Sequence, residues 1–217
     1  MATGPMSVPG AGARLRATMV ATTEVERPVA TEEDTALVAR AHAGDGNAAE
    51  ALLVRHELAV HRACAHLLPR GEDVEAAVQE TFVRALRSLA GYSGAGSFAG
   101  WLASIAVNLC RDRLRRHRLV PFVALESDDE QRGPLAVLAS PEPSPERVAM
   151  ARQAVARVRS AVERLPDRQR EVFTLRFYAG LDLAAIAEAL AVDVGTVKTH
   201  LHRALQRVRE AAEEAMP

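Results

Sequence analysis

The residues with the clearest chemical potential lie near the C-terminus, where residues 196–209 carry four positive charges and no acid. Basic and hydrogen-bonding side chains contact phosphates and the edges of bases, and a helix that presents them on one face fits the major groove of DNA. The side chains expected on that face are Thr196, Lys198, Thr199, His200, His202, Arg203 and Arg207. A solvated basic helix face is the alternative interpretation.

Other residues with chemical potential do not form a convincing site. His61, Cys64 and His66 are metal-binding residue types, but at ~100° per residue of a helix His66 points about 140° away from His61. The loop GYSGAG has Ala95 where a nucleophile elbow needs its second glycine. The chain contains no dinucleotide-binding fingerprint, phosphate-binding Walker loop or HExxH zinc motif. We therefore expect no metal, no cofactor and no enzymatic activity.

The composition is that of an ordinary globular protein. The 217 residues include 27 basic and 28 acidic side chains, for a net charge of −1, and 48% are apolar. No stretch approaches the ~20 apolar residues of a membrane span, and the first thirty residues lack the apolar core of a signal peptide. Cys64 and Cys110 are far apart in the sequence, which suits a reducing compartment. We expect a cytoplasmic protein without membrane insertion.

Apolar residues recur with helical periodicity, and no strand-like alternation is present. The clearest stripe consists of Phe98, Trp101, Leu102, Ile105 and Leu109. Because Trp101 lies on this stripe, we interpret it as a core residue. The predicted helices begin near residue 34 and then cover about 48–68, 72–89, 98–118, 145–165, 166–179, 182–190 and 194–213.

The last two predicted helices have the spacing of a helix-turn-helix. Asp182 and Asp193 each precede a helix and can cap it by accepting hydrogen bonds from its free N–H groups. Ala187 is small where the second helix must cross the first. The inner faces are expected to consist of Leu183, Ile186, Ala187, Leu190, Val194, Val197, Leu201, Leu205 and Val208.

Between the two helical halves the composition changes. Residues 124–147 contain six acids and two arginines, for a net charge of −4, and prolines recur at 134, 141, 143 and 145. Such a composition is typical of an extended linker. We therefore divide the chain into a disordered tail (1–30), an N-terminal helical domain (31–118), an acidic linker (119–146) and a C-terminal helical domain (147–217).

Residues 165–210, LPDRQREVFTLRFYAGLDLAAIAEALAVDVGTVKTHLHRALQRVRE, resemble region four of bacterial sigma factors, especially the extracytoplasmic-function (ECF) type. The piece GTVKTHL alone also resembles the DNA-binding domain of LuxR-type transcriptional regulators, which is the alternative function. Residues 72–118 resemble sigma region two along their whole length, in the order VQETF, SFxxWL and IAVNLCRDRLRR. LuxR-type regulators have nothing similar there.

This resemblance implies an all-α fold of two small helical domains, sigma region two and sigma region four with its helix-turn-helix, joined by an acidic flexible linker. It implies a sigma factor that binds core RNA polymerase and promoter DNA, with a probable anti-sigma factor as a further partner. The C-terminal helix would read the minus-thirty-five promoter element, and the N-terminal domain would melt the minus-ten element.

The resemblance also assigns roles within the N-terminal domain. The outer face of the helix near 72–89 would dock on the polymerase through Glu72, Asp73, Glu75, Gln79, Glu80 and Arg84. The loop and helix that follow would contact the minus-ten element through Tyr92, Ser93, Asn108, Arg111, Arg113, Arg115 and Arg116. In this reading Tyr92 stacks on an extruded base, and the five arginines in residues 111–118, with one aspartate, contact phosphates.

The sequence departs from the family pattern in four places, one of which is Thr199-His200 in the last predicted helix, where a Ser-Arg pair is frequent. Ala76 and Leu86 replace an acid and a tryptophan that are frequent in these sigma factors, and Ala99-Gly100 replaces a polar pair before Trp101. The distribution of charge along the sequence nevertheless agrees with the resemblance. Residues 31–80 carry −6 on the side expected to meet polymerase, whereas residues 111–118 and 196–209 each carry +4 where DNA is expected. The near-neutral total hides this segregation.

Overall fold

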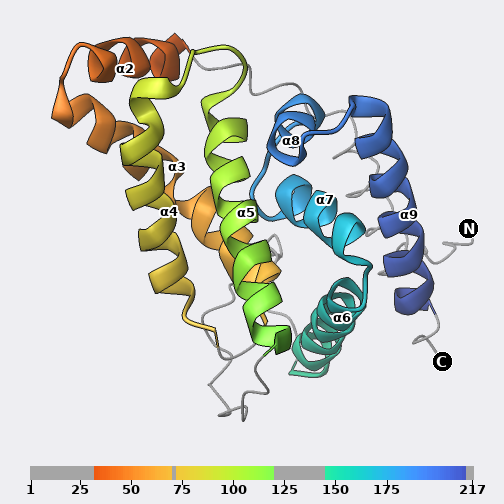
Figure 1. Cartoon of the computed structure of the whole chain (residues 1–217). Helices are drawn as coiled ribbons and strands as arrows, with labels where there is room; N and C mark the ends of the chain where they lie inside the picture. Colours follow the sequence, from red (N-terminus) through yellow and green to blue (C-terminus); the bar gives the residue numbers. More distant parts are fainter. Residues whose placement is uncertain (1–31, 70–71, 120–144, 214–217) are drawn as a thin grey trace, which may run out of the picture.

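The computed structural model describes residues 32–69, 72–119 and 145–213, and these ranges contain helices and no strand. The α-helices agree with the predicted ranges to within about two residues, whereas the short 3-10 helix at Leu89–Gly91 was not predicted. The helices form an N-terminal unit and a C-terminal unit (Figure 1). In chain order the elements are α2 (Glu32–His42), α3 (Gly46–Leu67), α4 (Val74–Ser88), the short 3-10 helix η1 (Leu89–Gly91), α5 (Phe98–Leu119), α6 (Pro145–Glu163), α7 (Asp167–Phe177), α8 (Leu183–Leu190) and α9 (Val194–Glu213).

Short polar side chains cap the starts of five helices. Asp45 accepts hydrogen bonds from the first backbone N–H groups of α3, and Asp73 accepts one at the start of α4. The hydroxyl of Ser97 accepts the N–H of Gly100 in α5. The predicted caps of the helix-turn-helix are confirmed, since Asp182 accepts from Ala185 N at 2.7 Å and Asp193 from Thr196 N at 2.7 Å. These bonds satisfy N–H groups that have no partner within the helix.

The N-terminal unit is organised around α3 and α5, which pack against each other and against α4. Leu52 and Cys64 of α3 and Phe98, Leu102 and Leu109 of α5 are almost completely buried, so the predicted apolar stripe forms the core. Trp101 is half-buried against the rings of Phe98 and Tyr92, as expected of a core residue. Cys110 is a buried, free thiol.

The C-terminal unit packs α6, α7 and α8 against α9. Val197, Leu201 and Val208 are buried and Leu205 is partly buried, as the helix-turn-helix pattern predicts. The expectation that Val194 is buried was wrong: the side chain is 38% exposed because Val194 is the first residue of α9 and lies beyond the packed part of the hairpin. Ala191 adopts a left-handed conformation (φ 54°), which turns the chain sharply between α8 and α9.

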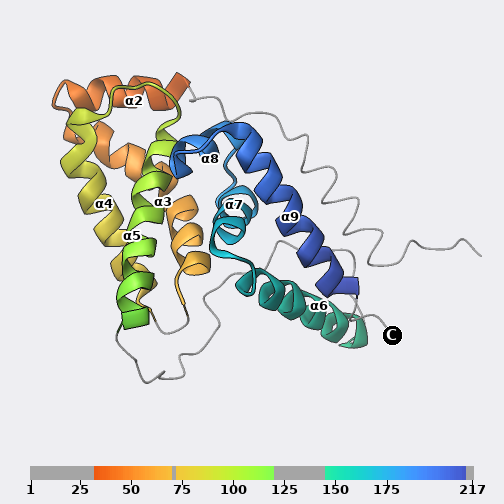
Figure 2. The ribbon, with the colours of Figure 1, turned by 45° about the vertical axis from the view of Figure 1, so that its right-hand side comes forward.

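The two units are in direct contact (Figures 1 and 2). Helix α5 lies along α8, and α3 packs against α7, so one continuous apolar core contains residues of both units. The predicted tail and nearly all of the predicted linker lie outside the described residues. Asp34, near the start of α2, is buried and pairs with Arg55 and His56.

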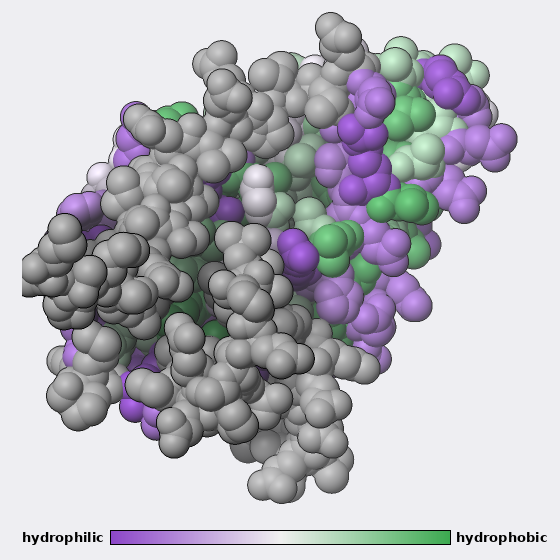
Figure 3. Space-filling view, turned by 180° about the vertical axis from the view of Figure 1, so that it is seen from behind, coloured by the Kyte–Doolittle hydropathy of each residue, from purple (hydrophilic) through white to green (hydrophobic). Residues whose placement is uncertain are grey.

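The exposed surface of the N-terminal unit is mixed. Seen from behind, hydrophilic and apolar side chains alternate over its visible part (Figure 3). The largest exposed apolar side chains are Val54 and Leu58 on α3 and Val83 and Leu86 on α4. Among the described helices, none is both long enough and apolar enough to cross a membrane.

Candidate nucleic-acid and polymerase interfaces

The outer face of α9 is the most open of the predicted sites. Lys198, Thr199, His202, Arg203 and Arg207 are exposed, whereas Thr196 and His200 are half-buried. Within the described residues, no hydrogen bond or ion pair holds the side chains of Lys198, His202, Arg203 or Arg207. A basic helix face without internal partners keeps its charge available for an external polyanion.

The two threonines of this face already make local hydrogen bonds. Thr196 Oγ1 donates to Asp193 Oδ2 at 2.6 Å, and this bond lowers the pKa of Asp193. Thr199 Oγ1 donates to the carbonyl of Gly195 at 3.0 Å. Both hydroxyl oxygens can still accept a hydrogen bond, but their protons are engaged. The side-chain donors of this face that remain free among the described residues are therefore those of Lys198, His202, Arg203 and Arg207.

The loop before α5 differs from the expectation for Tyr92. The ring is only 7% exposed and packs against Phe98 and Trp101, with centroids 5.7 and 5.0 Å away. Its hydroxyl donates to the carbonyl of Gly96 at 3.2 Å, and burial raises the pKa of Tyr92. In this structure Tyr92 is thus part of the core and cannot stack on a base. Ser93 is exposed and its hydroxyl accepts the N–H of Ala95.

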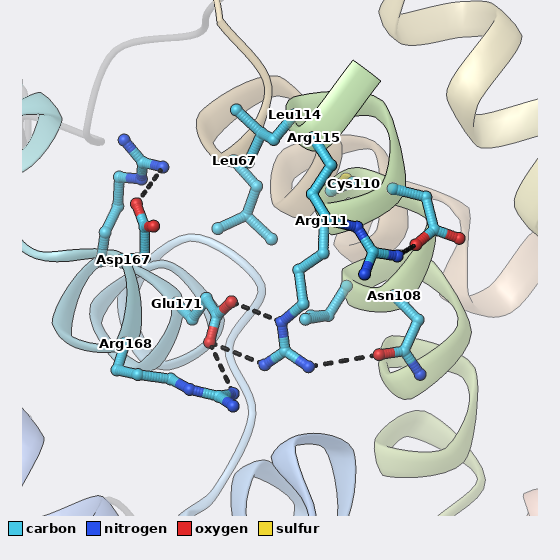
Figure 4. A pocket seen from close by; sticks show the side chains of 12 residues that line it. Leu67, Asn108, Cys110, Arg111, Leu114, Arg115, Asp167, Arg168 and Glu171 are labelled. Atoms are coloured by element: carbon cyan, nitrogen blue, oxygen red, sulfur yellow. Dashed lines mark hydrogen bonds and ion pairs between the residues drawn. The ribbon is translucent and has the colours of Figure 1, made fainter. Parts of the chain in front are cut away.

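The basic end of α5 is neutralised to a large extent by acids of other elements. Arg111 forms a bidentate ion pair with Glu171 of α7, with N–O distances of 2.6 and 2.8 Å. It also donates a hydrogen bond to Asn108 on its own helix at 3.2 Å (Figure 4). Glu171 also accepts from Arg168 at 3.3 Å. The hydrogen bond with Glu171 raises the pKa of Arg111. These side chains line a cavity of about 430 Å³ between α5 and α7.

The remaining predicted arginines of α5 fall into two groups. Arg113 is mostly buried and contacts α4, where it donates to Glu80 at 3.1 Å and lies 3.5 Å from Glu72. Arg115 pairs with Asp112 one turn earlier, and Arg116 is exposed. The structure therefore brings Asn108 and Arg111 together, whereas Arg113 points toward α4.

The predicted polymerase-facing residues in and just before α4 also fall into two groups, those that are paired within the protein and those that are exposed. Glu80 binds Arg113 and also Arg84, which donates at 2.5 Å. Partial burial acts to raise the pKa of Glu80, but the hydrogen bonds from Arg113 and Arg84 hold it below its usual value. Glu72 is half-buried, whereas Asp73, Glu75 and Gln79 are exposed. Asp73 caps α4, and Glu75 accepts from His61 at 2.9 Å.

The comparisons with known proteins agree with this geometry. Residues 52–120 match the family "Sigma-70 region 2", and residues 156–208 match the family "Sigma-70, region 4". The ECF RNA polymerase sigma-E factor of Escherichia coli K12 is 32% identical over 180 residues, which cover 81% of this chain and 92% of that protein. The chain belongs to the ECF-type sigma factors.

Two further relatives support the membership. The RNA polymerase sigma-H factor of Pseudomonas aeruginosa is 29% identical over 188 residues, covering 85% of this chain and 94% of that protein. The ECF RNA polymerase sigma factor SigE of Mycolicibacterium smegmatis is 31% identical over 159 residues. This match covers 73% of this chain, but only 59% of the longer relative.

Among solved structures, CnrH in complex with the cytosolic domain of CnrY is similar with a TM-score of 0.62 and 26% identity, covering 85% of this chain and all of that one. The sigma factor RpoE of Bartonella quintana, in complex with the anti-sigma factor NepR, has a TM-score of 0.57. At 20% identity, over 77% of this chain and 98% of that one, the second likeness concerns the fold.

As an ECF-type sigma factor, the chain is an alternative sigma factor that directs transcription, and sigma factors are not a class of catalytic enzymes. The comparisons give no support to the LuxR-type alternative, since residues 52–120 match sigma region 2. His61 pairs with Glu75 and the ring of His66 stacks on Tyr178 at 3.5 Å, so these two histidines face different elements. Within the described ranges, no cluster of three metal-ligating residues is present.

The acids of the C-terminal unit that bind Arg111 and Ser97 could not be identified from the sequence. Glu171 follows Arg111 by 60 residues, and Glu188 follows Ser97 by 91, so no local pattern links them. The available local signal was weak, since the helix Asp167–Phe177 contains two acids, Asp167 and Glu171, and three arginines. Gly100, which departs from the family pattern, lies against the backbone of Ala185 in α8, where a larger side chain would not fit.

Proposed function

We propose that this sigma factor acts in the cytoplasm, binds core RNA polymerase through its region two domain (31–118) and reads promoters through both domains. The observation that carries the proposal is the open, acid-free face of α9. It projects from a capped helix-turn-helix whose inner face is buried in the region four domain (147–217). An exposed basic helix on a rigid support is what docking in the major groove requires.

In the minus-thirty-five element, we assign the main contacts to Lys198, His202, Arg203 and Arg207. Their side chains are exposed and have no partner among the described residues, so binding DNA breaks no internal contact. Thr196, Thr199 and His200 are assigned supporting contacts, because the two hydroxyl protons are already engaged and His200 is half-buried. Arginine can recognise guanine through two hydrogen bonds, whereas lysine suits phosphates as a point charge.

In the minus-ten element, the exposed residues Ser93, Asn108, Arg115 and Arg116 are the ones that DNA can reach without rearrangement. Arg111 becomes available when its pair with Glu171 opens. Arg113 is assigned a positioning role, since it joins α5 to Glu72 and Glu80 of α4. On α4, the exposed side chains of Asp73, Glu75 and Gln79 form the polymerase-facing surface, and Arg84 helps to hold Glu80.

An anti-sigma factor is proposed as a further partner. Two structurally similar proteins were solved with a second protein bound. The sigma factor RpoE of Bartonella quintana is bound to the anti-sigma factor NepR, and CnrH is bound to the cytosolic domain of CnrY. For this chain the proposal rests on that similarity. The acidic linker is proposed to connect the two domains, as its composition predicts.

The promoter geometry requires the two domains to separate. The minus-thirty-five and minus-ten elements are named for their positions on the promoter, which differ by about 25 base pairs. At ~3.4 Å per base pair this separation is about 85 Å. In the structure α5 lies directly along α8, and α9, the next helix, is only about 30 Å long at ~1.5 Å per residue. The arrangement described here therefore cannot contact both elements at once.

The function is tested by run-off transcription with purified protein, core RNA polymerase and a set of promoter fragments. We expect a complex with core polymerase and promoter-dependent transcripts. The double variant Glu75→Ala/Gln79→Ala, at two exposed residues of that surface, is expected to weaken association with the polymerase, while far-ultraviolet circular dichroism shows an intact helical fold. A chain that binds duplex DNA but never associates with core polymerase would contradict the proposal.

A further inference from the structure

The two cysteines of the chain, which are far apart in the sequence, lie side by side in the structure. Cys64 lies on α3 and Cys110 on α5, and these two helices pack against each other in region two. Both thiols are free, and a hydrogen bond joins them. Thr81 of α4 is a further hydrogen-bond partner of Cys64. The sequence shows no partner for either cysteine, whereas the fold pairs them.

This group of three side chains lies inside region two, where α3, α4 and α5 pack against one another. Cys64 and Thr81 are 0% exposed, and Cys110 is 1% exposed. A single buried cysteine is usually a small packed residue of the core. Two thiols in contact have a chemistry that a single thiol lacks, because they can be oxidised together to a disulfide.

The two thiols are chemically unequal. The hydrogen bond with Cys110 lowers the pKa of Cys64, and Thr81 acts in the same direction against the effect of burial. The hydrogen bond with Cys64 and burial raise the pKa of Cys110. The positive charge of Arg113 favours the thiolate at both positions. Because the thiolate is the nucleophilic form, Cys64 is the better nucleophile and Cys110 retains its proton.

A small oxidant can approach this pair from the cavity between α5 and α7. Cys110 is one of the residues that line this cavity, whose volume is about 430 Å³ (Figure 4). A water molecule takes up about 30 Å³ in the liquid, and hydrogen peroxide is larger by only one oxygen atom. Cys64 contacts Cys110 from α3. The cavity can therefore bring a peroxide molecule to within one side chain of Cys64.

We propose that Cys64 and Cys110 form an oxidation site, at which hydrogen peroxide converts the two thiols into a disulfide that joins α3 to α5. In the first step the Cys64 thiolate attacks one oxygen of the peroxide. The S–O bond forms and the O–O bond breaks, and the leaving hydroxide takes up the proton that Cys64 had released. The products are a sulfenic acid at Cys64 and one water molecule.

Cys110 resolves this sulfenic acid. Its sulfur attacks the sulfur of Cys64, so that the S–S bond forms and the S–O bond breaks. The leaving hydroxide takes up the proton of the Cys110 thiol and becomes a second water molecule. In total the two thiols lose two electrons and two protons, and the peroxide is reduced to two water molecules. Exchange with cellular thiols returns the disulfide to the reduced pair.

The disulfide leaves the helices in place and makes region two harder to unfold. Two sulfur atoms that already share a hydrogen bond need only a small shift to reach the ~2.05 Å of a disulfide. The bond closes a loop of about 45 residues, and a loop of this length restricts the unfolded chain considerably. We therefore expect the oxidised chain to keep its helices at temperatures at which the reduced chain unfolds.

The wild-type, full-length chain tests the site directly. Reduced protein is treated with hydrogen peroxide in the native state, unfolded in urea and alkylated, and the intact chain and its proteolytic peptides are analysed by mass spectrometry. We expect no alkylation at either cysteine, a cross-linked pair of peptides that contain Cys64 and Cys110, and a monomer in size-exclusion chromatography. Dithiothreitol should restore alkylation at both positions.

Peroxide treatment of the urea-unfolded chain is the control, since it oxidises the cysteines without the fold. Thiols that stay open to alkylation after treatment of the native chain, but not after treatment of the unfolded chain, would overturn the site. Cys64 and Cys110 would then be packing residues only. A disulfide between two chains instead of within one would overturn it as well.

Single variants test the roles of the two thiols. Cys110→Ala removes the resolving thiol, so oxidation should stop at a sulfenic acid on Cys64, which dimedone traps. Cys64→Ala removes the better nucleophile and should be labelled by dimedone several times more slowly. Equal labelling would overturn the assignment of Cys64 as the nucleophile. Far-ultraviolet circular dichroism checks the fold of each variant, and the wild-type experiment depends on neither.

Thermal unfolding measures the consequence for stability. The midpoint of the oxidised wild type should lie about 5–10 °C above that of the reduced wild type, and dithiothreitol should abolish the difference. Peroxide-treated Cys110→Ala cannot form the bond and should show no increase. Equal midpoints for the two wild-type forms would overturn the stabilising effect. None of these measurements involves polymerase or promoter, so their outcome is independent of the run-off transcription that tests the proposed function.

Discussion

The basic face of α9 and the basic end of α5 are made of the same residue types and were assigned to the same polyanion, but their surroundings differ. On α9, Lys198, Arg203 and Arg207 project from a helix whose neighbours offer them no acid within the described chain. On α5, Arg111 and Arg113 each bind a carboxylate of another helix. The basic side chains of the first surface have no partner among the described residues, whereas those of the second are largely paired within the protein.

The difference shows what decides whether an arginine is a binding residue. Its charge and helical phase place it on a surface, but a carboxylate remote in sequence can convert it into a structural residue. Arg113 links two helices of region two, and Arg111 links region two to region four. Helix α9 combines a buried inner face with outer side chains, Lys198, His202, Arg203 and Arg207, that have no hydrogen bond or ion pair among the described residues.

The largest effect is expected where the face is open. Arg203→Ala should weaken binding of the full-length chain to a minus-thirty-five duplex by about 1–3 kcal/mol if the side chain recognises a base. The free energy of unfolding should change by less than about 0.5 kcal/mol, because the exposed side chain makes no internal contact. Fluorescence anisotropy measures the first quantity and urea denaturation the second. Arg62→Ala on α3 is the charge-matched control, and an equal loss of affinity in both variants would remove Arg203 from the interface.

On α5 the order of effects is reversed. Arg113→Ala should lower the free energy of unfolding by about 1–2 kcal/mol, because Glu80 and the Asp73 carbonyl lose a charged donor. Solvent screening of the half-exposed Glu80 keeps the effect below that of a fully buried pair. Arg116→Ala, which removes an exposed arginine from the same helix, should leave stability unchanged. Urea denaturation of both variants tests the contrast, and equal stabilities would mean that Arg113 is not a positioning residue.

These differences also define what the sequence could predict. Helical periodicity and capping residues such as Asp182 and Asp193 are local, so the helices and the helix-turn-helix followed from spacing alone. The family resemblance supplied the order of the two domains. The burial of Tyr92 was missed because it depends on the packing of Phe98 and Trp101 around the ring. A Gly-rich loop looks exposed in the sequence, whether or not its aromatic residue turns inward.

The seam between the domains lay beyond sequence reasoning for a related reason. A glycine at position 100 has several possible explanations in the sequence alone. The structure shows which one applies, because the backbone of Ala185 lies directly beside Gly100. Glu171 is equally consistent with a solvated helix face. A contact between elements 60 or more residues apart leaves no periodic signal, so the sequence left open whether the two domains pack together.

A smaller effect on α9 tests whether Lys198 contacts phosphate. Lys198→Ala should reduce the slope of log affinity against log salt by about one, because one fewer counterion is released. Between 0.05 and 0.2 M salt, this corresponds to a roughly fourfold weaker loss of affinity. Titrations of duplex DNA at several salt concentrations measure the slope. Lys198→Arg keeps the charge and should retain the wild-type slope. An unchanged slope in Lys198→Ala would place the lysine outside the interface.

The smallest effect compares two histidines with opposite surroundings. His56 is largely buried and its Nε2 lies 3.1 Å from Asp34 Oδ2, whereas His202 is exposed on α9. Burial lowers the pKa of His56 despite Asp34, which acts to raise it. The folded chain therefore binds this proton less readily than the unfolded chain, whose histidine titrates near about pH 6.5. The contribution of His56 to stability is complete above that pH and is lost as the pH falls toward the lower folded pKa.

Thermal unfolding between pH 7.5 and 5.5 measures this loss. Replacing His56 by glutamine should flatten the part of the pH profile below about 6.5, since the variant has no proton to take up there. His202→Gln should leave the profile parallel to that of the wild type. A profile that keeps its full slope in His56→Gln would assign the acid sensitivity to other groups. The difference between buried, paired side chains and exposed side chains on α9 would then be supported only by the arginine variants.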